Sequence, residues 1–198
     1  MFTGIIECLG KIVKIEQEGT NQHFTIESPI SSELRIDQSI AHNGVCLTVV
    51  DQKNNRHTVT AIEETLKRSN LRGLDIGSKV NLERCMKADA RIDGHFVQGH
   101  VDTVAKCINV ESLEGSWIYE FELADTEYNN LLVDKGSITI DGTSLTLVKS
   151  NWNDFSVAII PYTYENTVFN QLQKGDLVNI EFDILGKYIN KILASRNA

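Results

Sequence analysis

Two short rows of hydroxyl and thiol side chains are the residues best suited to chemistry in this sequence. If each row lies on a strand, Cys46 and Thr48 share one face of the first strand, and Ser144 and Thr146 share one face of the second. The apolar residues between them would then fill an interior, and the polar side chains would face outward. Such rows suit a flat polar ligand. Taken alone, each row is more simply explained as half-exposed strand residues with high β propensity.

The two rows belong to one internal repeat. The segment Ser39–Thr48 returns as Ser137–Thr146, a displacement of 98 residues, and the segment Gly77–Glu83 returns as Gly175–Glu181. This period indicates two copies of a domain, because solenoid and propeller units have only about 20 to 50 residues. Both copies keep serine and threonine, which the fold alone does not require. The repeat therefore favours two related ligand pockets in one molecule.

Two histidines could add proton transfer to this picture. His95 and His100 lie within Gly94–Asp102, and their separation of five residues would place them on opposite faces of a strand, which disfavours a shared metal ion. One imidazole could act as a general acid or base, although a single histidine is more often structural. The second copy has His100 where the first has Ile5, so we expect the halves to bind alike and to react differently.

Composition and known motifs exclude several functional classes. The net charge of −8 argues against a nucleic-acid surface, which needs clustered lysine and arginine. The sequence has no triphosphate-binding loop, no dinucleotide-binding glycine motif and no Ser-His-Asp signature. It also lacks a signal peptide and a membrane-spanning run, so we expect a cytoplasmic protein without a membrane partner. Four scattered cysteines predict free thiols and no zinc site: Cys8, Cys46, Cys85 and Cys107.

The elements that must position these residues follow from periodicity. Short runs of alternating apolar residues predict about six strands in each half, and hence an all-β fold of two similar six-stranded antiparallel Greek-key-like barrels. Short helices are predicted at Thr65–Leu71 and Thr163–Phe169, each with its threonine as the N-cap. The predicted domains are residues 1–90 and 91–183. Residues 184–198 form an amphipathic helix by their three- and four-residue apolar spacing, with a partner either on its own barrel or on another subunit.

Five motifs in the same order resemble the riboflavin synthase family over essentially the full length of the chain. They are residues 1–6, 43–48, 94–102, 135–146 and 160–163. The resemblance implies two six-stranded barrels, a C-terminal helix that assembles a homotrimer, and a reaction without metal or organic cofactor. In that reaction two molecules of 6,7-dimethyl-8-ribityllumazine exchange a four-carbon unit, giving riboflavin and 5-amino-6-ribitylamino-pyrimidinedione. A lumazine synthase is a possible further partner.

The resemblance also implies site residues, carried over motif by motif. The predicted catalytic residues are Ser39, Cys46, His100 and Thr146, for proton transfer and for polarising or trapping the acceptor. The predicted substrate-binding residues are Gly4, Ile5, Ile6, Cys46, Leu47, Thr48, Thr60, Ala61, Ile62, Glu63, Glu64, Thr65, Gly99, His100, Val101, Lys135, Ser144, Leu145, Thr146, Ala158, Ile159, Ile160, Pro161, Tyr162 and Thr163.

Two alternatives stay open at this stage. The first is a non-catalytic lumazine- or flavin-binding protein of the same fold, which the survival of both polar rows disfavours. The second is a flavin-dependent reductase barrel, for which a separate nucleotide-binding domain would be needed. The sequence does not say which barrel would hold the donor lumazine and which the acceptor.

Overall fold

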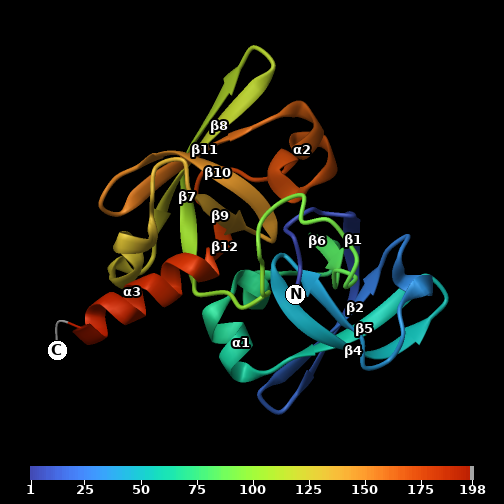
Figure 1. Ribbon diagram of the computed structural model, residues 1–198. Helices are drawn as coiled ribbons and strands as arrows, with labels where there is room; N and C mark the ends of the chain where they lie inside the picture. Colours follow the sequence, from blue (N-terminus) through green and yellow to red (C-terminus); the bar gives the residue numbers. More distant parts are fainter. Residues whose placement is uncertain (197–198) are drawn as a thin grey trace.

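The computed structural model describes residues 1–196, and this part of the chain forms two β-barrels side by side (Figure 1). The first barrel consists of β1 Cys8–Glu18, β2 Asn21–Glu27, β3 Ser39–His42, β4 Val45–Lys53, β5 Arg56–Ala61 and β6 Lys79–Arg84. The second consists of β7 Thr103–Leu113, β8 Ser116–Leu123, β9 Ser137–Ile140, β10 Thr143–Ser150, β11 Asp154–Ile159 and β12 Leu177–Phe182.

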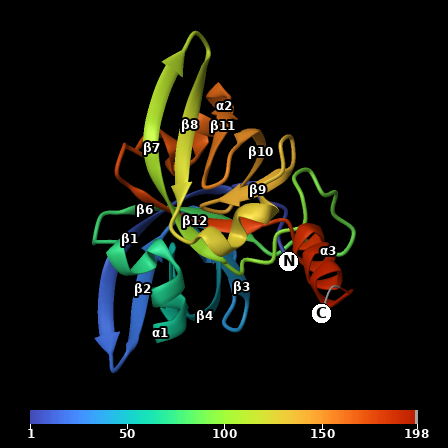
Figure 2. The same ribbon diagram turned by 90° about the vertical axis from the view of Figure 1, so that its left-hand side faces the viewer.

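Both barrels are closed, antiparallel and identical in strand order. The first closes as β1-β2-β5-β4-β3-β6, and the second closes as β7-β8-β11-β10-β9-β12. Closure leaves no free strand edge, which suits short strands in a small domain. The β1–β2 and β7–β8 hairpins extend in opposite directions from the joined barrels (Figure 2). The predicted all-β fold of two similar six-stranded barrels is confirmed.

Each barrel encloses its own apolar core, as the alternation predicts. On β4, Val45, Leu47 and Val49 are buried inside the first barrel, while Cys46 is partly exposed and Thr48 is exposed. The same alternation on β10 turns its polar row outward from the second core. The polar rows therefore lie on the outer barrel surfaces, at the start of corresponding strands.

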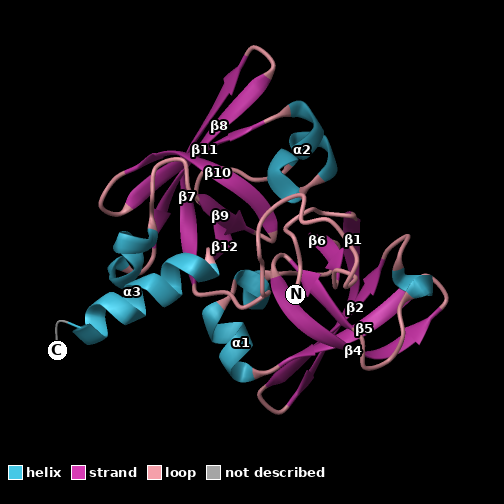
Figure 3. Cartoon of the chain, viewed as in Figure 1, coloured by secondary structure: helices cyan, strands magenta, loops and turns pink. Residues whose placement is uncertain are grey.

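The short helices lie where they were predicted, but their first residues differ. Helix α1 spans Glu63–Arg68 and helix α2 spans Pro161–Asn166 (Figure 3). Neither Thr65 nor Thr163 is an N-cap, so that prediction was wrong. Two glutamates in the first turn of α1 complement the helix dipole, and Pro161 is pre-organised for the first turn of α2. The remaining helical turns are 3-10 segments at Ser31–Glu33, Asn70–Gly73, Thr126–Leu131 and Val168–Asn170.

The tail forms helix α3, Ile184–Arg196, which projects away from the barrels (Figure 1). Positions 197 and 198 of the predicted helix lie outside the described residues. Five large apolar side chains of α3 are more than half exposed: Leu185, Tyr188, Ile189, Ile192 and Leu193. No helix in residues 1–196 has the length and hydrophobicity needed to cross a membrane.

Candidate functional site

Two short segments cross between the barrels near the N-terminus, which lies between them (Figure 1). Residues 2–7 lead into β1, and residues 97–102 lead into β7. They meet where Phe2 and Val97 form an antiparallel bridge, with N–H to O distances of 2.7 and 3.1 Å between the two backbones. Phe2 is fully buried there. The bridge fixes both segments at the junction of the two barrels.

Each crossing segment pairs with the polar row of the other barrel. The carbonyl oxygen of Gly99 accepts a hydrogen bond from the amide of Cys46 at 2.8 Å, and that of Gly4 accepts one from the amide of Ser144 at 2.8 Å. Both glycines have left-handed φ angles, 80° for Gly99 and 78° for Gly4. A Cβ atom on either would lie 2.6 Å from the Cβ of its partner. Only glycine permits this approach.

A buried carboxylate holds each crossing segment from its own barrel. Glu181 on β12 accepts three backbone N–H bonds from Gln98–His100, at 2.6, 2.9 and 2.9 Å. Glu83 on β6 accepts the amides of Thr3 and Gly4 at 2.7 and 3.0 Å. Burial raises the pKa of both carboxyls, and these hydrogen bonds oppose the rise. Sequence reasoning did not identify them as site residues, although both end the repeated segments Gly77–Glu83 and Gly175–Glu181.

A pocket of about 260 Å³ opens over the polar row of the first barrel. Its lining combines β4, α1 and the crossing segment 97–102: Val45, Cys46, Glu64, Thr65, Arg68, Ser69, Gly99, His100 and Val101. Ser39 faces Thr48 across the β3–β4 ladder, two pairs along from the Ala41–Cys46 pair and on the same face. Three of the predicted catalytic residues, Ser39, Cys46 and His100, are thus grouped around one barrel.

The Cys46 thiol is a hydrogen-bonding group at neutral pH and not a thiolate. Burial raises its pKa, and the nearby Ser39 hydroxyl only partly opposes this effect by hydrogen bonding. A nucleophilic cysteine needs the opposite shift. The exposed His100 imidazole is therefore the group of this pocket best suited to accept a proton.

The second polar row has a different neighbour. His95 Nδ1 lies 2.7 Å from Ser144 Oγ, and His95 Nε2 lies 3.1 Å from Thr139 Oγ1. Burial lowers the pKa of His95, which favours a neutral ring between the two hydroxyls. The predicted arrangement of His95 and His100 on opposite faces of one strand was wrong, because Gly94–Asp102 is loop with a single bridge residue.

Thr146, the fourth predicted catalytic residue, lies on β10 in the row of the second barrel and faces Ser137. Lys135 is exposed beside it, with its amide bonded to the Leu147 carbonyl at 3.0 Å. Its φ of 64° is a left-handed conformation, like the 69° of Asp37 at the equivalent position of the first copy. The second row therefore has a cation where the first has an acid.

The other predicted binding residues divide by the direction of their side chains. Leu47, Ala61 and Ile159 belong to the barrel cores, and Leu145 packs against the second core, so these residues offer a ligand mainly backbone atoms. Thr60 is part-buried and lies 2.9 Å from a ring nitrogen of His23. The remaining residues are exposed or half-buried: Ile5, Ile6, Ile62, Glu63, Ala158, Ile160, Pro161, Tyr162 and Thr163.

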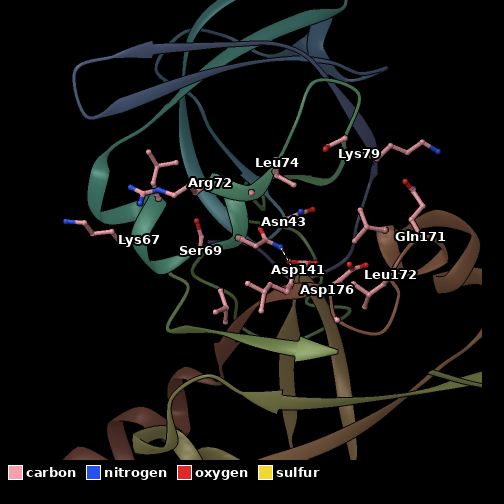
Figure 4. A pocket seen from close by; sticks show the side chains of 18 residues that line it. Asn43, Lys67, Ser69, Arg72, Leu74, Lys79, Asp141, Gln171, Leu172 and Asp176 are labelled. Atoms are coloured by element: carbon pink, nitrogen blue, oxygen red, sulfur yellow. Dashed lines mark hydrogen bonds between the residues drawn. The ribbon is translucent and has the colours of Figure 1, made fainter. Parts of the chain in front are cut away.

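A larger cleft of about 890 Å³ lies between the barrels and contains none of the predicted site residues (Figure 4). Asn43 and Asp141, at equivalent positions of the repeat, lie at its base. Asn81 donates to the Asp141 carbonyl at 2.8 Å, and Asn179 donates to the Asn43 carbonyl at 2.8 Å. These paired bonds fix the orientation of one barrel on the other. Burial raises the pKa of the Asp141 carboxyl to about 7, although Asn70 and the Asn179 amide donate to it.

The fold and the two rows define a class: a tandem β-barrel protein in which each repeat presents an outward polar row to a segment that leads into the other barrel. A family model described as "Lumazine binding domain" matches residues 3–85 and again residues 98–183. Riboflavin synthase from Bacillus amyloliquefaciens is 43% identical over 194 residues, covering 98% of this chain and 90% of that protein. Riboflavin synthase from Saccharomyces cerevisiae is 42% identical over 203 residues, covering 96% and 85%.

Solved structures share the fold. LumP complexed with riboflavin superimposes with a TM-score of 0.85 at 24% identity, covering 92% of this chain and 99% of LumP. LumP complexed with 6,7-dimethyl-8-(1'-D-ribityl)lumazine gives a TM-score of 0.83 at 24% identity, covering 91% and 98%. With the curated relatives at 42–43% identity across nearly the whole chain, this protein belongs to the riboflavin synthase family.

Proposed function

We propose that this protein converts two molecules of 6,7-dimethyl-8-ribityllumazine into riboflavin and 5-amino-6-ribitylamino-pyrimidinedione. The observation that carries the proposal is the matched construction of the two sites. Each combines the polar row of one barrel with a glycine-containing segment that leads into the other barrel. Two related pockets suit a reaction in which donor and acceptor are the same compound, because both can be held in reactive proximity.

The reaction needs no oxidant or reductant, since a four-carbon unit leaves one lumazine and joins the other. The residues of this chain bind, orient and move protons. His100 accepts a proton from an acidic methyl group of a bound lumazine, and Ser39 and the protonated Cys46 hydrogen-bond that ligand. Thr146, Ser144 and Lys135 hold the second lumazine. The predicted units, residues 1–90 and 91–183, would each hold one substrate molecule.

We further propose that α3 assembles three copies of the chain, so that the first pocket of one copy faces the second pocket of another. The support is the row of apolar side chains on α3, each of which is 52–65% exposed in the single chain. A contiguous exposed apolar surface of this kind is typical of a protein–protein interface. The predictions of a cytoplasmic location, of a homotrimer and of association with a lumazine synthase belong to this proposal. Sedimentation of the purified chain measures its oligomeric state, and sedimentation with a lumazine synthase measures their association.

Incubation of the purified protein with the ribityllumazine alone tests the reaction. We expect flavin absorbance and fluorescence to appear without any added reactant. A lumazine that binds and stays unchanged would instead identify a non-catalytic carrier. Lys53→Ala is a control expected to retain turnover, because Lys53 is exposed at the far end of β4, whereas His100→Ala combined with Ser39→Ala should abolish turnover.

A further inference from the structure

Each crossing segment ends in an acidic residue that accepts a backbone N–H and pairs with a basic side chain. The two segments differ in the element that supplies this basic side chain. Glu7 is the last residue of the first segment; it accepts the backbone N–H of Arg84 at 2.6 Å and pairs with the guanidinium of the same residue. Asp102 is its counterpart and accepts the backbone N–H of Phe182 at 2.9 Å. Because Phe182 has no charge, the cation comes from elsewhere: Lys187 of α3 lies 2.8 and 2.6 Å from the two carboxylate oxygens.

The Lys187–Asp102 pair is more deeply buried than the other ion pairs of the described residues. The side chains of Lys187 and Asp102 are 22% and 16% exposed, whereas the Lys67–Glu63 pair on α1 is 56% and 47% exposed. Exposed pairs contribute little, but a part-buried pair that contacts both carboxylate oxygens holds its partners in place. Removing either charge would leave the other uncompensated.

The same ammonium acts on a second carboxylate of the segment. Burial raises the pKa of Glu181, and the positive charge of Lys187 is one of the effects that oppose this rise. Glu181 accepts the three amides of Gln98–His100. One cation from α3 therefore pairs with the acid that ends the segment carrying His100, and its charge favours the ionised form of the acid that accepts the segment's amides.

The geometry points to Lys187 as a positioning residue that couples helix α3 to the first pocket. By pairing with both carboxylate oxygens of Asp102, it fixes the end of the segment that presents Gly99 and His100 to the polar row of the first barrel. The inference deepens the proposed function and rests on it, because His100 is the proton acceptor there. The segment beside the second row is held differently: within residues 1–196, the acid at its end, Glu7, pairs with Arg84 of the first barrel and not with α3. Loosening α3 thus affects the first pocket selectively.

The test compares Lys187→Met with Lys191→Met, a matched control that changes an exposed lysine of the same helix. Both variants are made with Thr146→Trp, which blocks the second pocket, so that riboflavin fluorescence quenching reports the first pocket alone. Lys187→Met should weaken riboflavin binding about tenfold, the loss expected for a charge-assisted hydrogen bond that orders a segment. It should also accelerate hydrogen exchange of the Gly99 and His100 amides. Lys187→Arg should restore both properties.

Equal riboflavin affinity and equal exchange rates in Lys187→Met and Lys191→Met would overturn the coupling. If Lys187→Met does not fold, Asp102→Asn replaces it, because the amide oxygen still accepts the Phe182 N–H while the charge is lost. The same affinity loss and faster exchange are expected, and their absence would again overturn the inference. Both readouts are independent of turnover. A wild-type protein that fails to convert ribityllumazine refutes the proposed function, while the exchange contrast still decides the coupling.

Discussion

Replacing Asp141 with asparagine should stabilise the protein at alkaline pH and leave its stability unchanged in acid. The repeat itself supplies the model for this change, because Asn43 occupies the equivalent position. The Asn43 side-chain oxygen accepts the Asn81 amide at 2.7 Å, just as Asp141 accepts the Asn179 amide at 2.8 Å. An asparagine at position 141 can therefore keep the hydrogen bonds of the barrel junction without a buried charge.

The expected size follows from the pKa of Asp141, which burial raises from 3.8 to about 7 in the folded state. Between these values the folded protein keeps a proton that the unfolded chain has lost. The contribution of Asp141 to the unfolding free energy is therefore fully present below pH 4, and it is lost as the pH rises to 7. The full difference corresponds to about 4 kcal/mol at 1.4 kcal/mol per pKa unit, an order-of-magnitude figure.

Urea denaturation of wild type and Asp141→Asn, followed by circular dichroism from pH 4 to 8, measures this difference. Other titrating groups cancel when the two proteins are compared at each pH. The unfolding free energy of the variant should exceed that of wild type by an amount that grows across this range. A difference that is constant with pH, or a variant less stable at pH 8, would refute the assignment of a destabilising buried charge to Asp141.

Three further predictions concern the first barrel and the crossing segments. His57 is buried on β5, and burial lowers its pKa from 6.5 to about 4. Its stabilising contribution is therefore present above pH 6.5 and lost as the pH falls toward 4, and His57→Gln should flatten the acid side of the urea stability profile by about 3 kcal/mol. In the Thr146→Trp background, which leaves only the first pocket open, Gly99→Ala should abolish riboflavin binding by titration, because its Cβ would meet that of Cys46; Gly115→Ala, with a similar φ of 82° and open space around it, should bind normally in the same background. Phe2→Ala should lower the unfolding free energy by about 3 to 5 kcal/mol in the same denaturation assay, since its ring is fully buried at the junction; a loss below 1 kcal/mol would contradict this packing role.

The barrels could be predicted because their determinants are local and occur twice. Alternating apolar residues on β4 and β10 place Leu47 inside and Thr48 and Thr146 outside, whatever the rest of the chain does. The repeat then fixes equivalent strands. The helix starts were mispredicted because Thr65 and Thr163 were given capping roles, while the acidic first turn of α1 and Pro161 set the actual beginnings.

The crossing of the leading segments could not be read from periodicity. Gly4 and Gly99 each bond to the opposite barrel, and strand alternation carries no information about which barrel a loop will contact. Glu83 and Glu181 were visible as the ends of a repeated segment, yet only the fold shows that they hold backbone amides. His95 was placed on a strand face, although the glycines around it favour a loop that brings it to Ser144.

In the proposed trimer, one working site combines the first pocket of one copy of the chain with the second pocket of another. Thr48→Trp blocks the first pocket and Thr146→Trp blocks the second; both positions are exposed and equivalent in the repeat. Each variant alone should be inactive in conversion of ribityllumazine to riboflavin. Mixed after dissociation and reassembly, the two should recover up to about a quarter of wild-type turnover, the fraction of interfaces with two open pockets under random mixing. A mixture that stays inactive although mixed assemblies form would contradict the account.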